Sequence, residues 1–147
     1  MEQQEKKTEE IRQEVRLNKY MAQCGICSRR EADRLISEGK VTVNGIKADA
    51  GRKIGSHDKV ALEGRVLDGG QRKVVLAYYK PVGVVCTERD PHAQTILSDM
   101  ISYPVRVTYA GRLDKDSEGL LLLTNDGDLI EKMMKGSHFH EKEYVVR

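Results

Sequence analysis

The stretch that decides the fold of this chain is Ala110–Gly127, AGRLDKDSEGLLLLTNDG. Its run of four leucines lies between two glycines, and an apolar run this short predicts a buried strand rather than a helix. A polar loop that contains Arg112 and Asp114 leads into this strand. A carboxylate on such a loop can be held rigidly and partly desolvated, as catalytic carboxylates are. The stretch therefore predicts a sheet with Asp114 as its candidate reactive group.

The overall composition indicates a globular protein with one ordinary domain or two small ones. The 147 residues are 33% charged and 39% hydrophobic. No apolar run approaches the roughly 20 residues of a membrane span, and the N-terminus lacks the apolar segment of a signal peptide. We therefore expect no membrane partner. Three cysteines, an odd number, favour a reducing cytoplasm without a disulfide framework.

The charge is distributed unevenly along the chain. Residues 1–73 hold 16 basic and 12 acidic residues, whereas residues 74–147 hold 9 and 11. Within the first part, residues 16–59 carry 10 basic and 5 acidic groups, a net charge of +5. A solvated surface can have this composition, but a small basic module joined to a near-neutral one favours docking on a polyanion.

The pattern up to residue 68 predicts two short helices and a small sheet. Residues 1–15 form a charged tail with little to bury. A first helix is expected over residues 16–24, and a second from a capping box at Ser28 and Glu31 to about residue 38. Strands are expected at residues 41–43 and 60–62. The Asn44-Gly45 pair predicts a hairpin turn, because both positions of that turn need positive φ. Residues 69–73 are the best candidate linker.

This first part resembles the S4 RNA-binding domain over about residues 16–65. The matching stretches are RLNKY from Arg16, SRREA from Ser28 and GKVTVNG from Gly39. The resemblance implies RNA binding by residues that position the enzyme through the RNA backbone and shape. The implied contacts are Arg16, Asn18, Lys19, Ser28, Arg29, Arg30, Lys40, Asn44 and Lys47. Several of the basic ones stand at helix starts, which also attract phosphate.

The sequence pattern of residues 74–147 predicts a second domain. Val74–Tyr79 is rich in strand-forming residues and ends in the turn sequence KPVG from Lys80. Helices are expected over residues 94–101 and 126–135. The second of these is expected to turn four apolar side chains inward, those of Leu129, Ile130, Met133 and Met134. Residues 138–140 are interpreted as a loop entering a last strand.

The second part resembles the pseudouridine synthases that act on ribosomal RNA. The resemblance lies in Gly111–Asp114 (GRLD), Lys80–Gly83 (KPVG) and Lys142–Val146 (KEYVV). It implies an α+β fold throughout: an S4-like helix-helix-hairpin domain, then the N-terminal part of a mixed, mainly antiparallel sheet domain. It also implies that Asp114 is the nucleophile and that Tyr144 stacks on a flipped-out uridine and assists proton removal.

The same resemblance implies that Arg112 contacts RNA and helps to displace the target base. For Lys80 it implies a role in shaping the active-site floor or a contact with the RNA backbone. The partner is structured ribosomal RNA, and neither a cofactor nor an obligate protein partner is implied. Arg112 is two residues from Asp114, so an extended segment would point their side chains to opposite sides and make an ion pair doubtful.

Metal and redox sites are disfavoured. The sequence from Asp114 to Gly119 imitates half a calcium loop, but its twelfth position is Asn125 instead of a bidentate glutamate. Cys24 and Cys27 form a CxxC without a second pair or a βαβ context, so we predict neither zinc nor a redox centre.

The match departs from the family in three respects, one of which is the atypical pair His140-Glu141. Glu118 stands where a small or neutral residue is common, and the sequence ends at Arg147 directly after the tyrosine motif. We therefore expect an incomplete catalytic domain with an unpaired sheet edge. Two functions remain: isomerisation of a uridine in ribosomal RNA, or RNA binding by an S4 protein whose synthase half is inactive.

Overall fold

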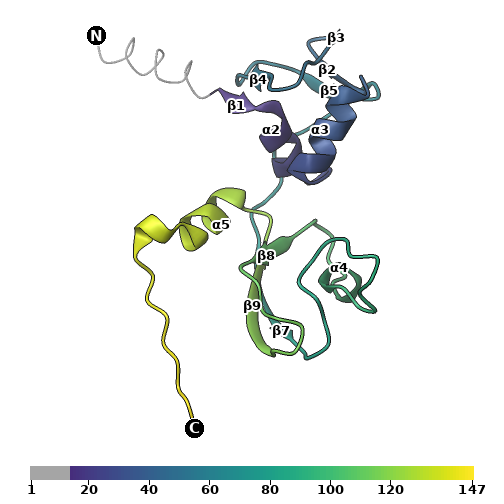
Figure 1. The fold of residues 1–147 in the computed structure, drawn as a ribbon. Helices are drawn as coiled ribbons and strands as arrows, with labels where there is room; N and C mark the ends of the chain where they lie inside the picture. The colour runs from purple at the N-terminus through teal and green to yellow at the C-terminus, as the bar shows by residue number, and fades with distance from the viewer. Residues whose placement is uncertain (1–13) are drawn as a thin grey trace, which may run out of the picture. The chain divides into compact units, whose positions relative to one another are not determined.

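The computed structural model describes residues 14–147, which fold into two units (Figure 1). The first unit ends at Arg72 and the second spans Lys73–Arg147. Both units mix helices with sheets, and every strand pair within the described sheets is antiparallel. The predicted α+β class is confirmed.

The two helices of the first unit contribute to one apolar core. The elements of this unit are β1 (Val15–Arg16), α2 (Leu17–Gln23), α3 (Arg29–Ser37), β2 (Val41–Val43), β3 (Ile46–Lys47), β4 (Lys53–Ile54), β5 (Val60–Leu62) and β6 (Arg65–Val66). Helix α2 buries Leu17 and Met21, four residues apart, and α3 buries Ala32 and Ile36 at the same spacing. This spacing places each pair on one helix face. Both helices were predicted within one residue at each end.

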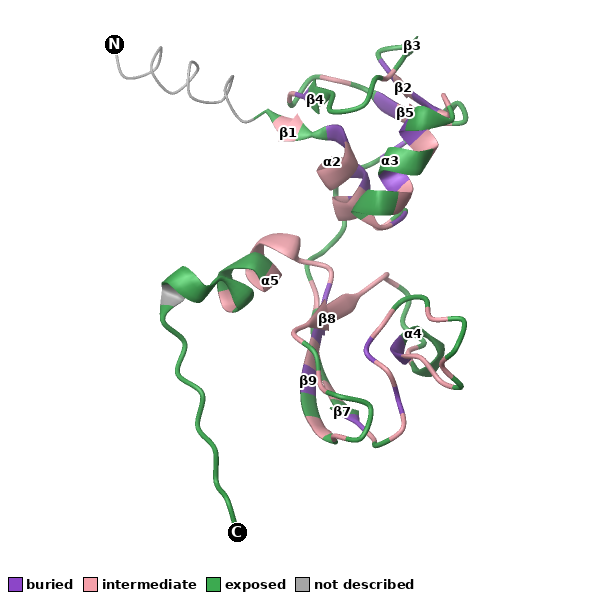
Figure 2. Cartoon of the chain, viewed as in Figure 1, coloured by how far each residue is buried: buried purple, intermediate pink, exposed green. Residues whose placement is uncertain are grey.

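The first unit has a two-stranded sheet, β1-β4, and a four-stranded sheet with the order β3-β2-β5-β6. Asn44 and Gly45 have φ values of 52° and 80°, as the predicted tight hairpin turn requires. Val41, Val43 and Val60 are buried in the core with the helices. In Figure 2 the purple segments of this unit lie where its helices and strands face one another.

The second unit is built on a three-stranded sheet in the order β7-β9-β8. Its elements are β7 (Val75–Lys80), α4 (Leu97–Met100), β8 (Thr108–Ala110), β9 (Gly119–Thr124), α5 (Gly127–Met134) and the 3-10 helix η2 (Gly136–His138). The leucine run forms strand β9, as predicted, and β9 lies at the centre of this sheet. It was expected to be buried, but only one of its faces is. Leu121 and Leu123 are 4% and 1% exposed, whereas Leu120 is 68% exposed.

The helix predicted over residues 94–101 is shorter than expected. Only Leu97–Met100 is helical, because the residues before it make a parallel bridge instead. The amide of Val85 donates to the carbonyl of Thr95 at 3.1 Å, and the amide of Leu97 donates to the carbonyl of Val85 at 2.9 Å. This pairing uses the backbone groups that a longer helix would need.

Two predictions for the C-terminal part are wrong. Helix α5 has nearly the predicted bounds, yet none of its residues is buried and Met134 is 57% exposed. Residues 139–147 form no strand, and Figure 1 shows this segment leading away from the sheet. Strand pairing depends on an edge to pair with as well as on β propensity, and this segment pairs with none of the described strands.

The sequence Thr124-Asn125-Asp126 ties the end of β9 to the start of β7. Thr124 donates its hydroxyl to the carbonyl of Val74 at 2.6 Å, and Asn125 accepts from the amide of Val74 at 2.8 Å. The Asp126 carboxylate caps α5 by accepting from two of its first amides, and it pairs with the Lys73 ammonium at 2.9 Å. A hydrogen bond from Lys73 lowers the pKa of Asp126 below its ordinary value of 3.8.

We predict that Asp126 makes the stability of the second unit depend on pH in acid. A carboxylate whose pKa is lowered by folding stabilises the fold above its unfolded-state pKa, and this contribution is lost as the pH falls through the folded-state pKa. Asp126→Asn keeps a capping oxygen and should remove that dependence. Asp126→Ala should lower the free energy of unfolding by about 1 kcal/mol more than Asp126→Asn does, because alanine has no oxygen to cap the helix. Melting followed by circular dichroism between pH 7 and pH 3 measures both effects, with Asp116→Asn, an exposed loop acid, as control.

Candidate active site and RNA interface

The loop between β8 and β9 holds Asp114. Its backbone closes a turn in which the amide of Ser117 donates to the carbonyl of Asp114 at 3.0 Å. Asp114 itself is exposed. The loop is thus ordered by its backbone, but the partial desolvation expected for the Asp114 carboxylate is not present in this structure.

Lys80, the last residue of β7, lies beneath this loop and has no exposed surface. Its ammonium donates to three carbonyls: to Pro81 at 2.8 Å, to Lys115 at 3.4 Å and to Ser117 at 2.6 Å. The Lys115 carbonyl also accepts from the amide of Gly83 at 2.7 Å. We call this arrangement the lysine clamp. It fastens the turn sequence KPVG to the Asp114 loop, which lies more than thirty residues later in the chain.

The geometry of the lysine clamp favours one of the two roles predicted for Lys80 over the other. A side chain with no exposed surface does not reach an RNA backbone, so the structure does not support the predicted RNA contact. Shaping the floor of the site agrees with the geometry. A buried ammonium is costly unless its protons are bonded, and the three carbonyls meet that need without a carboxylate.

Arg112 and Tyr144 are both exposed but differ in setting. Arg112 belongs to the Asp114 loop and has no ion pair among residues 14–147. Tyr144 is 79% exposed in the C-terminal segment that forms no strand. The structure therefore places Arg112 beside Asp114 in the same loop, and it does not bring Tyr144 to that loop.

The predicted RNA contacts of the first unit fall into two groups. Arg16, Arg29, Arg30 and Lys47 are exposed, and none has an ion pair within the described part of the chain. Lys19 is half-buried at the start of α2. The first four are available to phosphate.

The polar residues predicted to contact RNA have structural partners instead. Ser28 accepts from the Glu31 amide at 3.2 Å and so caps α3. Asn18 donates to Asp33 at 3.0 Å, joining α2 to α3. Asn44 donates to Asp58 at 2.7 Å and accepts from the amide of Lys59, joining the hairpin turn to the loop before β5.

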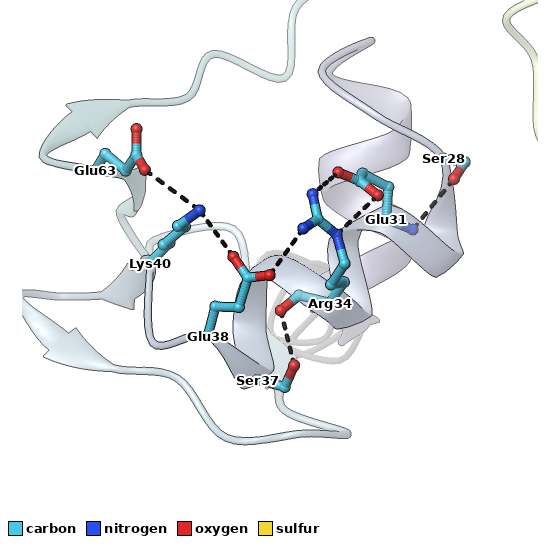
Figure 3. Close-up of polar contacts among 7 residues, drawn as sticks. All are labelled: Ser28, Glu31, Arg34, Ser37, Glu38, Lys40 and Glu63. Atoms are coloured by element: carbon cyan, nitrogen blue, oxygen red, sulfur yellow. Dashed lines mark hydrogen bonds and ion pairs between the residues drawn. The ribbon is translucent and has the colours of Figure 1, made fainter.

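A network of ion pairs neutralises the C-terminal end of α3 (Figure 3). The Arg34 guanidinium bonds to Glu31 and, at 2.8 Å, to Glu38. Lys40 pairs with Glu38 at 2.7 Å and with Glu63 at 3.9 Å. The hydrogen bond to Glu38 raises the pKa of Lys40 above its ordinary value. Lys40 is thus a poorer phosphate contact than its sequence position indicates.

Sequence reasoning missed this network and the lysine clamp for different reasons. The spacings Glu31–Arg34 and Arg34–Glu38 are those of helical ion pairs, so that signal was readable. The clamp joins Lys80 to main-chain carbonyls, which carry no residue-type signal.

No metal or redox centre is assembled by the described residues. Within them, no group of three or more His, Cys, Asp or Glu side chains could hold a metal ion. Cys24, Cys27 and Cys86 are buried free thiols, and burial raises the pKa of the Cys24 thiol, which lowers its reactivity. The same residues include no helix long and apolar enough to cross a membrane.

Comparison with known families accounts for both units. The sequence profile of the S4 domain matches residues 15–60, and that of RNA pseudouridylate synthase matches residues 74–147, half of the chain. The chain belongs to the RNA pseudouridylate synthase family. Its first unit is an S4 unit and its second is a synthase unit, in agreement with the resemblance noted in the sequence.

Individual relatives cover most of this chain. It is 46% identical over 134 residues to the dual-specificity RNA pseudouridine synthase RluF of Escherichia coli K12, and 45% identical to that of Salmonella typhi. In each case the match covers 90% of this chain and 46% of the relative. An uncharacterised RNA pseudouridine synthase of Rickettsia prowazekii is 39% identical, with 57% of its length covered. The chain thus spans about half the length of these relatives.

A solved structure described as a pseudouridylate synthase is also similar. It is 28% identical, with a TM-score of 0.46, and the match covers 84% of this chain and 54% of that one.

We predict that Lys80→Met loosens the Asp114 loop. The change removes the lysine donor from the carbonyls of Pro81 and Ser117, while the carbonyl of Lys115 keeps the amide of Gly83. Each acceptor left unsatisfied inside the protein costs about 1–3 kcal/mol. Amide hydrogen exchange should speed up at Ser117 and Gly83, and the synthase unit should unfold at lower denaturant concentration. Lys115→Met, an exposed change in the same loop, is the matched control and should leave both unchanged. Equal exchange rates in wild type and Lys80→Met would contradict the role given to the clamp.

Proposed function

We propose that this chain supplies the RNA-docking unit and the nucleophile loop of an enzyme that converts a uridine of ribosomal RNA to pseudouridine. The observation that carries the proposal is Asp114 on an ordered loop, fastened by the lysine clamp, in the unit that matches the synthase family. The names of its relatives support RNA as the substrate.

The reaction needs one carboxylate and no cofactor. The glycosidic bond to the uracil nitrogen breaks, the base turns within the pocket, and a carbon–carbon bond forms to the same sugar. In our proposal the ionised Asp114 attacks either C6 of the base or C1′ of the sugar, or it eases deprotonation of the sugar. In this proposal the bound RNA supplies the desolvation of Asp114 that this structure lacks.

The remaining roles concern the target base. A uridine inside folded RNA has to be extruded before a protein carboxylate can reach it. Arg112, on the same loop as Asp114, is suited to hold the displaced strand through its phosphates. We assign stacking on the flipped base, and help with proton removal, to Tyr144. This role requires residues 139–147 to pack onto the synthase sheet, so we expect Tyr144 to become buried in the active enzyme.

In this proposal the S4 unit docks the enzyme on ribosomal RNA. Residues 69–73 are the linker between the S4 unit and the synthase unit. Among the predicted RNA contacts of this unit, four basic residues are exposed and have no ion pair within residues 14–147: Arg16, Arg29, Arg30 and Lys47. They suit contacts to phosphate, which fix position without reading sequence. A cytoplasmic location follows from this substrate.

The second candidate function is RNA binding without catalysis. It is favoured by the exposure of both Tyr144 and Asp114 in this structure. The two functions share the S4 surface and differ only in turnover.

Binding by the S4 unit is tested with Arg29→Ala combined with Arg30→Ala. Losing phosphate contacts should weaken binding to a ribosomal RNA fragment and flatten the dependence of log affinity on log salt by about 0.7–0.9 per contact. Arg34→Ala is the control, because the charge of Arg34 is already neutralised by two glutamates. An unchanged slope in the double variant would contradict this docking surface.

Catalysis is tested with Asp114→Asn. The change keeps the size of the side chain and removes its charge, so turnover should disappear while RNA affinity stays within a few-fold. The assay detects pseudouridine in ribosomal RNA by chemical labelling or mass spectrometry. It uses residues 1–147 joined to the remaining half of the Escherichia coli relative, with Asp116→Asn as the matched control. Turnover by Asp114→Asn would exclude Asp114 as the nucleophile. Absence of turnover in the unmutated fusion would favour the binding function.

A further inference from the structure

A two-stranded ribbon at the start of the S4 unit brings two cations together. Strand β1 pairs with β4 so that Val15 lies opposite Ile54 and Arg16 lies opposite Lys53. Ile54 is 3% exposed within the core of the unit, and the amide of Leu17 donates to the carbonyl of Arg52 at 2.8 Å. The ribbon is therefore anchored to the folded unit on both sides of the Arg16–Lys53 pair.

The pairing register sets two like charges side by side. Residues directly opposite in an antiparallel pair have their side chains on one face, and like charges in that position destabilise the pair. Arg16 and Lys53 are both exposed. Sequence reasoning could not find this pair, because the two residues are far apart in the chain and become neighbours only through the strand register.

The acidic side chains nearby do little to neutralise the positive charges of Arg16 and Lys53. The nearest recorded partner is Glu14, whose carboxylate lies 4.0 Å from the Lys53 ammonium, with both side chains about 60% exposed. An exposed pair at this distance contributes little. Arg16 has no ion pair among residues 14–147. This contrasts with Arg34 and Lys40, which each have two glutamates.

We propose that Arg16 and Lys53 form a pincer for one RNA backbone phosphate. This inference rests on the proposed RNA binding by the S4 unit, and it extends that surface onto β4 through Lys53. A guanidinium gives a phosphate two directed hydrogen bonds and an ammonium adds a compact charge, so the two cations complement each other. A phosphate between them turns mutual repulsion into attraction. The pincer holds the backbone and carries no base preference.

The experiment compares Lys53→Gln, Arg16→Gln and Glu14→Gln in the full 147-residue chain. Affinity is measured over a range of salt concentrations for a ribosomal RNA fragment and for an unrelated RNA of the same length. Lys53→Gln and Arg16→Gln should each weaken both complexes alike and flatten the salt slope by about 0.7–0.9. Glu14→Gln should strengthen binding, because it removes the acid nearest the pincer. An unchanged slope in Lys53→Gln, or weaker binding in Glu14→Gln, would overturn the pincer.

Thermal unfolding of the same variants distinguishes a binding role from a structural one. Because Lys53→Gln removes a cross-strand repulsion, its melting temperature should equal or exceed that of the wild type, and a lower one would overturn the proposal. The controls also separate this inference from the proposed function. RNA binding that Arg29 and Arg30 support but Lys53 does not would refute the pincer alone. Failure of the wild-type chain to bind either RNA would refute RNA docking as a whole.

Discussion

The lysine clamp is the interaction on which the candidate site depends. An ammonium inside a protein is stable only when its protons are bonded, and here Lys80 finds three carbonyls, two of them in the Asp114 loop. The same requirement that keeps Lys80 satisfied therefore keeps the loop in place. Strand β7 positions Lys80, and β9, which pairs with β7 along its whole length, positions the end of the loop. The Asp114 loop is thus held by backbone and sheet, while Asp114 itself stays exposed.

In the S4 unit, some basic side chains are neutralised by ion pairs and others are not. Ion pairs with glutamates neutralise Arg34 and Lys40 at the C-terminal end of α3, whereas Arg29 and Arg30 at its start remain unpaired in the described structure. The basic side chains near the C-terminal end of α3 are thus used in ion pairs, whereas those at its start are available to phosphate. A net charge of +5 over residues 16–59 does not reveal this division, because net charge does not distinguish a neutralised arginine from a free one.

The sheet of the synthase unit has one buried face and one face with exposed apolar side chains. Leu121 and Leu123 pack in the core, while Tyr79 and Leu120, paired across β7 and β9, are more than 60% exposed. Helix α5 likewise buries none of its residues. The relatives are about twice as long as this chain. A sheet face with exposed apolar side chains is one against which another element can pack.

Local patterns in the sequence determined the helices of the S4 unit, the Asn44-Gly45 turn and the strands at residues 75–80 and 119–124, because capping, spacing and turn geometry act between neighbouring residues. The motifs around Asp114 likewise indicated the family. Tertiary structure decided what depends on distant partners. It cut the helix expected at residues 94–101 to four residues, because Val85 competes for the backbone before it. It left Tyr144 outside any strand, buried Lys80 under the Asp114 loop, and set Arg16 beside Lys53. In each case the deciding contact joins residues that no local pattern relates, and only the folded chain brings them together.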